Sequence, residues 1–170
     1  MKTAIFAVAG AAAVALAQPA SFDDLGVIGG EGTYSFDTTG SFNVTGAFDL
    51  DTEIGLWDAS GTLLDSDDDG LGFPFSIVTA DLSAGMYFIG IGEFDSIFGD
   101  GFTNTGTSLE DGEQGDAVLN INGSFAASQI FDAVPGGNGE TAFFKVTVVP
   151  APGAAALLGL GGLAAVRRRR

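Results

Sequence analysis

Residues 51–64 read Asp-Thr-Glu-Ile-Gly-Leu-Trp-Asp-Ala-Ser-Gly-Thr-Leu-Leu, and this stretch predicts a β-hairpin. Ile54 and Leu56 lie two residues apart, which is the spacing of one face of a strand, so a short strand is expected over Glu53 to Asp58. Asp58 to Gly61 is typical of a tight turn with glycine at its last position. Thr62 to Leu64 then begin the returning strand. The fold class indicated here is all-β, with antiparallel neighbours.

The same pattern of short strands and turns continues on both sides of the hairpin. Ser41 to Leu50 alternates apolar and polar residues and predicts a half-buried strand whose inner face carries Phe42, Val44, Gly46, Phe48 and Leu50. Seven to nine such strands predict an antiparallel β-sandwich of jelly-roll or immunoglobulin-like type. Five other strands are expected. One lies around Tyr34 and Phe36, and two lie over Phe75 to Ala80 and over Gly85 to Gly92. The fourth has Ala117, Leu119 and Ile121 on one face, and the fifth has Phe144, Val146 and Val148 on its inner face.

The charge of this region is strongly one-sided. Residues 18–149 hold all 22 acidic residues and one basic residue, Lys145, which gives a formal charge of −21. Such a surface repels nucleic acid and anionic lipid, so no nucleic-acid partner is expected. Its expected partners are cations, above all Ca²⁺, and neutral or cation-bridged extracellular polysaccharide. The alternative is that the charge only keeps an extracellular or salt-adapted protein soluble.

Two residue types are absent from the chain, cysteine and histidine. Their absence excludes thiol nucleophiles, thiolate and imidazole metal sites, and Ser-His-Asp or Cys-His catalysis. A pair of carboxylates remains as catalytic machinery, with Lys145 as a lone base. We expect no catalytic residues and a protein that is not an enzyme.

The acidic run Asp65-Ser66-Asp67-Asp68-Asp69-Gly70 matches the first half of a calcium loop. Asp65, Asp67 and Asp69 offer carboxylates at every second position, which can converge on a hard cation. The second half is missing because position twelve is Ser76 and not a glutamate. Asp51 is therefore predicted to complete a Ca²⁺ site, with Asp49 and Glu53 as other candidates. The alternative is a solvated acidic turn.

A long loop is predicted over Glu93 to Gly115, either flexible or built for a ligand or a second cation. Phe94, Phe98 and Phe102 are its expected anchors. Its candidate cation ligands are acidic: Glu93, Asp95, Asp100, Glu110, Asp111, Glu113 and Asp116. Trp57 and Tyr87 are expected in the core, with sugar stacking as the alternative.

The central segment resembles a known family of extracellular domains. Two segments are similar to bacterial pre-peptidase C-terminal (PPC) domains. The first is the quoted hairpin together with the acidic run after it. The second is Ala80-Asp81-Leu82-Ser83-Ala84-Gly85-Met86-Tyr87 together with the strand that it begins. The similarity covers about residues 38 to 92 well. It implies a non-catalytic β-sandwich, often supported by calcium, that sometimes binds extracellular polymer.

Residues 1–17 have the pattern of a secretory signal peptide. Lys2 precedes an apolar run from Ala4 to Leu16, and the small residues Ala15 and Ala17 predict cleavage before Gln18. Residues 18–149 are then the exported acidic β-sandwich domain. An N-terminal helix is expected only as part of the signal.

Residues 150–170 form the predicted sorting tail. Val149, Pro150, Ala151 and Pro152 interrupt the last strand, Gly153 to Val166 form an uncharged apolar run, and Arg167, Arg168, Arg169 and Arg170 end the sequence. We expect a hydrophobic helix in the inner membrane with the arginines as its cytoplasmic stop. The alternative is a buried C-terminal helix of a soluble domain.

This order of motif, apolar run and arginine cluster resembles the PEP-CTERM sorting signal, here with Pro-Ala-Pro in place of Pro-Glu-Pro. The resemblance implies an exosortase-like membrane transpeptidase as partner and a setting of exopolysaccharide production. The expected itinerary is export through the inner membrane, transient anchoring, and then the cell surface or extracellular matrix. The expected function is that of a non-enzymatic envelope or matrix protein. The alternatives are a partner-binding subunit of a surface assembly and a small secreted carboxylate-dependent glycoside-active enzyme.

Replacement of Arg167 to Arg170 by serine should change the cellular distribution of the protein, because it removes the positive charges that oppose transfer of the tail. Fractionation and mass measurement check this. An unchanged distribution and mass would show that the tail is not a sorting address.

Overall fold

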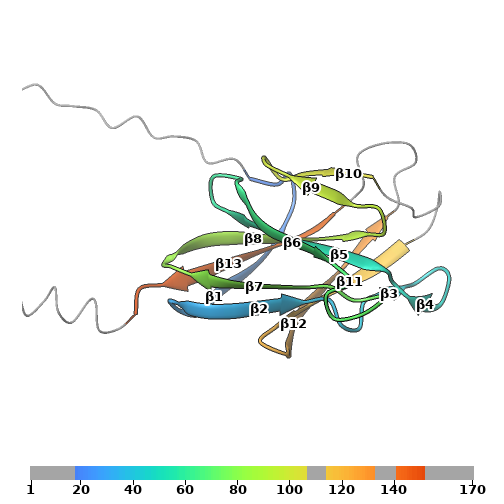
Figure 1. Ribbon diagram of the computed structural model, residues 1–170, viewed down its shortest axis with the longest axis horizontal. Coiled ribbons are helices and arrows are strands. Elements are labelled where there is room, and N and C mark those ends of the chain that lie inside the picture. Colours follow the sequence, from blue (N-terminus) through green and yellow to red (C-terminus); the bar gives the residue numbers. More distant parts are fainter. Residues whose placement is uncertain (1–17, 107–113, 133–140, 152–170) are drawn as a thin grey trace, which may run out of the picture.

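The computed structural model describes residues 18–106, 114–132 and 141–151, and the described residues contain β-strands and no helix (Figure 1). Within these three ranges, thirteen strands form two large sheets and one small hairpin. The predicted all-β class is confirmed. Within these ranges no helix has the length and hydropathy needed to cross a membrane. The signal residues Ala15 and Ala17, Pro152 and the four arginines lie outside the described residues.

The first sheet has the strand order β1-β13-β8-β5-β6. Its β13, β8, β5 and β6 pair antiparallel, as expected, but β1 runs parallel to β13 and forms one edge. The prediction of a purely antiparallel fold is therefore wrong at this edge. The strand bounds are β1 Asp23–Gly30, β5 Thr52–Asp58, β6 Leu63–Asp68, β8 Gly85–Glu93 and β13 Ala142–Val149.

The second sheet has the order β4-β3-β11-β2-β7, with β12 paired to β11. All of its described pairings are antiparallel. The bounds are β2 Gly32–Asp37, β3 Phe42–Asn43, β4 Phe48–Asp49, β7 Ile77–Leu82, β11 Gln114–Ile121 and β12 Ser124–Asp132.

The main core lies between the two sheets, as in a β-sandwich. Every second residue of the central strands points into it, and these side chains have almost no exposed surface. The first sheet contributes Ile54, Leu56, Ile89, Ile91, Phe144, Val146 and Val148, and the second contributes Tyr34, Phe36, Val78, Leu82, Ala117 and Leu119. The predicted inner faces of the 117–121 and 144–148 segments are thus confirmed for Ala117, Leu119 and the residues of β13. The finer jelly-roll or immunoglobulin-like class stays a prediction.

The segment Ser41 to Leu50 is not the single half-buried strand that its alternation predicted. It folds back through a turn at residues 44–47 into the short pair β3 and β4, with Ala47 at a positive φ of 57°. Phe42, Val44 and Phe48 are exposed as a result, and Leu50 alone of the five predicted inner residues reaches the core. Asn43 supports the turn because its side-chain oxygen accepts a hydrogen bond of 2.6 Å from Gly46 N–H.

A second apolar cluster lies on the other face of the first sheet. The predicted long loop contains a hairpin there, β9 Ile97–Gly99 and β10 Thr103–Thr105, so the prediction of a structureless loop is wrong for these residues. The rings of Phe98 and Phe102 lie 5.3 and 5.9 Å from that of Trp57, whose Nε1–H donates to Gly99 O (2.9 Å). Trp57 is fully buried and belongs to the core, as expected.

Gly55 allows this hairpin to lie close to β5. A Cβ at this position would overlap the Trp57 ring and come within 3.0 Å of Phe98. Of the three expected anchors of the loop, Phe98 and Phe102 pack in the second cluster, whereas Phe94 is exposed.

The contrast between Phe36 and Phe42 tests the corrected assignment. Phe36→Ala should lower the free energy of unfolding by about 3–5 kcal/mol because it leaves a cavity between the sheets. Phe42→Ala should cost about 1 kcal/mol or less, because that ring is 39% exposed. Urea unfolding of both variants measures the difference, and equal losses would contradict the hairpin at residues 42–49.

Candidate cation site

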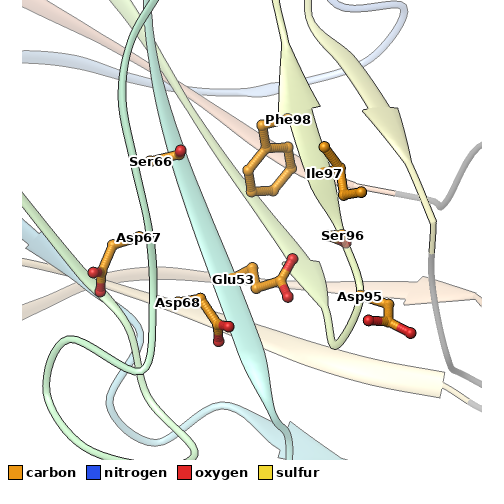
Figure 2. A pocket seen from close by; sticks show the side chains of 8 residues that line it. All are labelled: Glu53, Ser66, Asp67, Asp68, Asp95, Ser96, Ile97 and Phe98. Atoms are coloured by element: carbon orange, nitrogen blue, oxygen red, sulfur yellow. The ribbon is translucent and has the colours of Figure 1, made fainter.

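The candidate site forms at the end of the first sheet where β5 begins and β6 ends. The residues flanking these points are acidic, and β5 and β6 pair with Glu53 opposite Asp68 and Ile54 opposite Asp67. Side chains alternate between the faces of a strand, so Asp68 lies on the face opposite to Asp65 and Asp67. Figure 2 shows the carboxylate of Asp67 turned away from Glu53 and that of Asp68 nearer to it.

Three carboxylates converge at this point. Ligand oxygens of Asp51, Asp68 and Asp69 all lie within 4.8 Å of one another, the one such group found among the described residues. Asp69 reaches the group because its backbone adopts a positive φ of 61°. The structure therefore brings together two of the four predicted Ca²⁺ ligands, Asp51 and Asp69, and adds Asp68.

Asp65 and Asp67, the other two predicted ligands, are occupied with local backbone groups. Asp67 Oδ2 accepts hydrogen bonds of 2.8 Å from both Gly70 N–H and Ile77 N–H. Asp65 Oδ1 accepts one from Ser66 N–H at 3.0 Å. Gly70 is needed for close approach, since a Cβ there would overlap the Asp67 carboxylate. The alternating acidic pattern thus builds the end of a strand and its turn, and not a loop of converging oxygens.

Buried hydroxyl groups hold the acidic segments in place. Asp69 N–H donates to Ser76 Oγ (3.1 Å), and Ser76 Oγ in turn donates to Thr52 O. Thr38 Oγ1 lies 2.5 Å from Thr52 Oγ1 and accepts from Ser76 N–H (2.9 Å). Ser76 stands where a calcium loop would have glutamate, and its role here is to fix the turn that positions Asp69.

Glu53 adds a buried carboxylate to the group. It is 7% exposed, and its Oε2 has no hydrogen-bond partner. Burial, followed by the charges of Asp68 and other neighbours, raises the pKa of Glu53 to about 8, although a backbone hydrogen bond from Asp95 acts in the opposite direction. An acidic side chain buried in this way has a strong tendency to take up a proton or another ligand.

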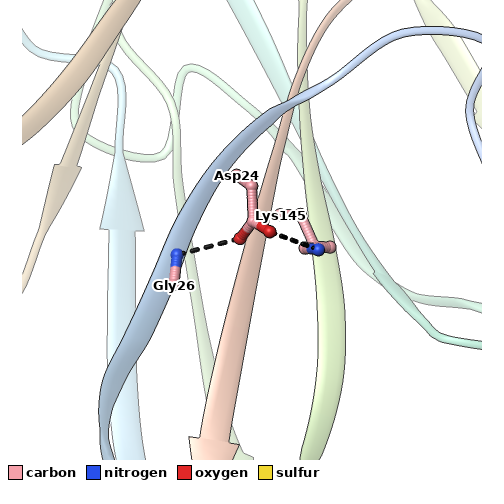
Figure 3. Close-up of polar contacts among 3 residues, drawn as sticks. All are labelled: Asp24, Gly26 and Lys145. Atoms are coloured by element: carbon pink, nitrogen blue, oxygen red, sulfur yellow. Dashed lines mark hydrogen bonds and ion pairs between the residues drawn. The ribbon is translucent and has the colours of Figure 1, made fainter.

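Neighbouring charges also raise the pKa values of Asp51 and Asp68. In both, burial is the largest cause, and the next is the charge of Asp69. Among the described residues these groups have no basic neighbour to offset the repulsion, because Lys145, the one basic residue of 18–149, pairs with Asp24 at 2.5 Å (Figure 3). That lysine holds the pKa of Asp24 below its usual range and lies 5.2 Å from the centre of the Phe22 ring.

A pocket of about 370 Å³ opens beside the three converging carboxylates. Its walls come from β5, β6, the turn after β8, and β9 (Figure 2). The lining residues are Glu53, Ser66, Asp67, Asp68, Asp95, Ser96, Ile97 and Phe98. Asp68 belongs both to this lining and to the converging group.

The acidic residues of the predicted loop do not gather in a second group among the described residues. Asp95 lines the pocket, Asp100 Oδ1 accepts a hydrogen bond from Leu63 N–H (2.9 Å), and Asp116 lies in β11. Glu93 is buried at the end of β8. Glu110, Asp111 and Glu113 lie outside the described residues.

Sequence reasoning named Glu53 and Asp95 as candidates but did not select Asp68. The alternation of side chains along a strand could have identified Asp68. In a strand that ends at Asp68, this residue must lie on the face opposite to Asp67. Comparisons with family models, with curated proteins and with solved structures found no match to this chain.

Stability should depend on pH through Glu53. Its folded-state pKa, about 8, lies above the ordinary value of 4.5, so its stabilising contribution is complete below pH 4.5 and is lost as pH rises through 8. In the presence of a chelator, the free energy of unfolding should decline between pH 5 and 8. Glu53→Gln should flatten that decline, as measured by urea unfolding at each pH.

Asp65→Asn is the matched control, because it removes an exposed carboxylate of the same hairpin outside the pocket. Its pH profile should follow that of the parent protein. A parent-like profile for Glu53→Gln would contradict the burial of an uncompensated carboxylate.

Proposed function

We propose that this chain is an exported, non-enzymatic cell-envelope or extracellular-matrix protein whose β-sandwich binds Ca²⁺ at Asp51, Asp68 and Asp69. The observation that carries the proposal is the convergence of these three carboxylates within 4.8 Å, without a basic neighbour in the part of the chain that the structure describes. Carboxylate oxygens are the ligands that Ca²⁺ prefers, and its shell of six to eight oxygens leaves places for water or a bound polymer. Glu53, buried beside Asp68, adds a carboxyl oxygen without a hydrogen-bond partner next to the site.

The export and sorting part of the proposal rests on the two ends of the sequence. A signal-like segment precedes Gln18, and the PEP-CTERM-like tail begins where β13 ends, at Val149 followed by Pro150. An exosortase-like membrane transpeptidase is the proposed partner for that tail, and association with exopolysaccharide is the proposed role outside the cell. A PPC-like domain displayed in this way acts by binding and not by chemistry.

A second candidate, carboxylate-dependent glycoside hydrolysis, is favoured by one observation. The raised pKa of Glu53 keeps that carboxyl protonated at neutral pH beside Asp68 and Asp95, which is the division of roles that an acid and its partner carboxylate need. An assay for reducing ends released from polysaccharides separates this candidate from the first. A pull-down from envelope extract tests the remaining alternative, a subunit of a surface assembly.

Millimolar Ca²⁺ should raise the melting temperature of the full chain in a mild detergent, and a chelator should reverse the gain. A cation that binds the folded state alone stabilises by about 2.7 kcal/mol at a hundredfold excess over Kd, which corresponds to roughly 10 °C for a domain of this size. Asp51→Asn combined with Asp69→Asn should remove most of the gain. Ionic strength is held constant with NaCl, because monovalent salt also screens the general repulsion.

Asp65→Asn should keep the full calcium response, since Asp65 bonds to its neighbour's backbone and not to the converging group. Asp67→Ala is unsuitable as a test because it also removes two hydrogen bonds that hold the turn. An equal gain from NaCl alone, or an undiminished response in the double variant, would overturn the calcium site.

A further inference from the structure

The pocket beside the converging carboxylates has a chemistry of its own. Its polar lining comes from Glu53, Asp68, Asp95, Ser66 and Ser96, whereas Asp67 lines it with its carboxylate turned away toward Gly70 and Ile77. Carboxylates accept hydrogen bonds and do not donate them when ionised. Ser96 Oγ accepts a hydrogen bond from Asn104 Nδ2 at 3.0 Å, which leaves its O–H as a donor for a ligand. The lining therefore combines carboxyl oxygens with hydroxyl donors, which suits a ligand whose own hydroxyl groups both donate and accept.

One acceptor in this wall has no partner within the protein. Glu53 Oε2 is buried and receives no hydrogen bond, while the rest of the residue is fixed on the central strand β5. A buried polar atom left unpaired costs free energy, so a ligand that donates to it gains binding energy at that point. This orphaned oxygen is a separate observation from the convergence of Asp51, Asp68 and Asp69.

Two residues of the pocket lining, Ile97 and Phe98, are apolar. Ile97 is 68% exposed, and Phe98 packs edge-on against Trp57 at 5.3 Å while also lining the pocket. Apolar side chains offer no ligand atoms to a metal ion. In the described residues, the carboxylate oxygens of Glu53, Asp68 and Asp95 do not all lie within 4.8 Å of one another.

We propose that this pocket binds one neutral sugar residue of a polysaccharide chain, with its hydroxyl groups donating to Glu53, Asp68 and Asp95 and its carbon face against Ile97 and Phe98. The volume of about 370 Å³ falls in the range of small-molecule sites, and the mixture of acceptors with an apolar wall matches the two faces of a pyranose ring. The inference rests on the proposed polysaccharide association and gives it a location. Asp68 places the sugar site directly beside the calcium site.

Emission of Trp57, the single tryptophan, provides the readout because its ring contacts Phe98 in the pocket wall. The full chain, in a detergent without a sugar headgroup, is titrated with cellotetraose, mannotetraose and galactotetraose, with Ca²⁺ and with chelator. At least one probe should change the emission saturably. Glu53→Gln should weaken its binding about fivefold, since the amide group replaces one acceptor oxygen by a donor and a neutral hydrogen bond contributes about 1 kcal/mol.

Ile97→Asp is a second variant that keeps the fold because the side chain is exposed, and it should also weaken binding. Asp65→Asn, outside the pocket, should bind as the parent does. Absence of binding by all three probes, or binding unchanged in both pocket variants, would overturn the inference. A second bound Ca²⁺ that disappears in Glu53→Gln would also overturn it, by showing that the pocket holds a cation.

The same titration in the Asp51→Asn and Asp69→Asn variant separates the two proposals. Sugar binding without any calcium stabilisation of the parent protein would sink the calcium site and leave this inference standing. Calcium stabilisation without sugar binding would do the reverse.

Discussion

Burial of β5 on both faces is the constraint on which the rest of this structure depends. Ile54 and Leu56 point into the core between the sheets, while Trp57 packs beneath the β9–β10 hairpin on the other side. A strand covered on both faces has no solvated side on which to place a charged residue. Glu53 is consequently buried because of its position in the strand, and no basic residue within the described ranges pairs with it.

The acidic site follows from this arrangement together with the extreme charge of the domain. Carboxylates gather at the end of β6 because the turn after it, held by Asp67 and Ser76, swings Asp69 back beside Asp51 and Asp68. In most proteins such a group would be balanced by lysine or arginine. Lys145 is far from this role, since it closes the parallel edge of the sheet by pairing with Asp24 on β1. The electrostatic balance of the site is left to protons, cations or bound ligands.

Much of the fold could be predicted because its strands obey local rules. The hairpin at residues 52–68, the strands around 77–82 and 85–93 and the inner face of β13 follow from the period of two and from turn residues. The alternation failed at residues 41–50, where Asn43 caps a tight turn and the apolar side chains stay exposed. A pattern of two faces indicates a strand only if another layer covers one of them, and that depends on distant residues.

The sequence by itself determined the residue types available to the protein: it excludes cysteine and histidine chemistry, concentrates the acidic residues in one domain and places short strands along it. Only the tertiary structure decided which carboxylates meet. Asp51 and Asp69 are joined by Asp68 and not by Asp65 or Asp67, because strand pairing fixes the face and a buried hydroxyl network fixes the turn. The pocket likewise unites segments some forty residues apart, Glu53 and Asp95 among them, through the fold of a hairpin onto a sheet. Contacts of that separation depend on how layers pack, which no local pattern encodes.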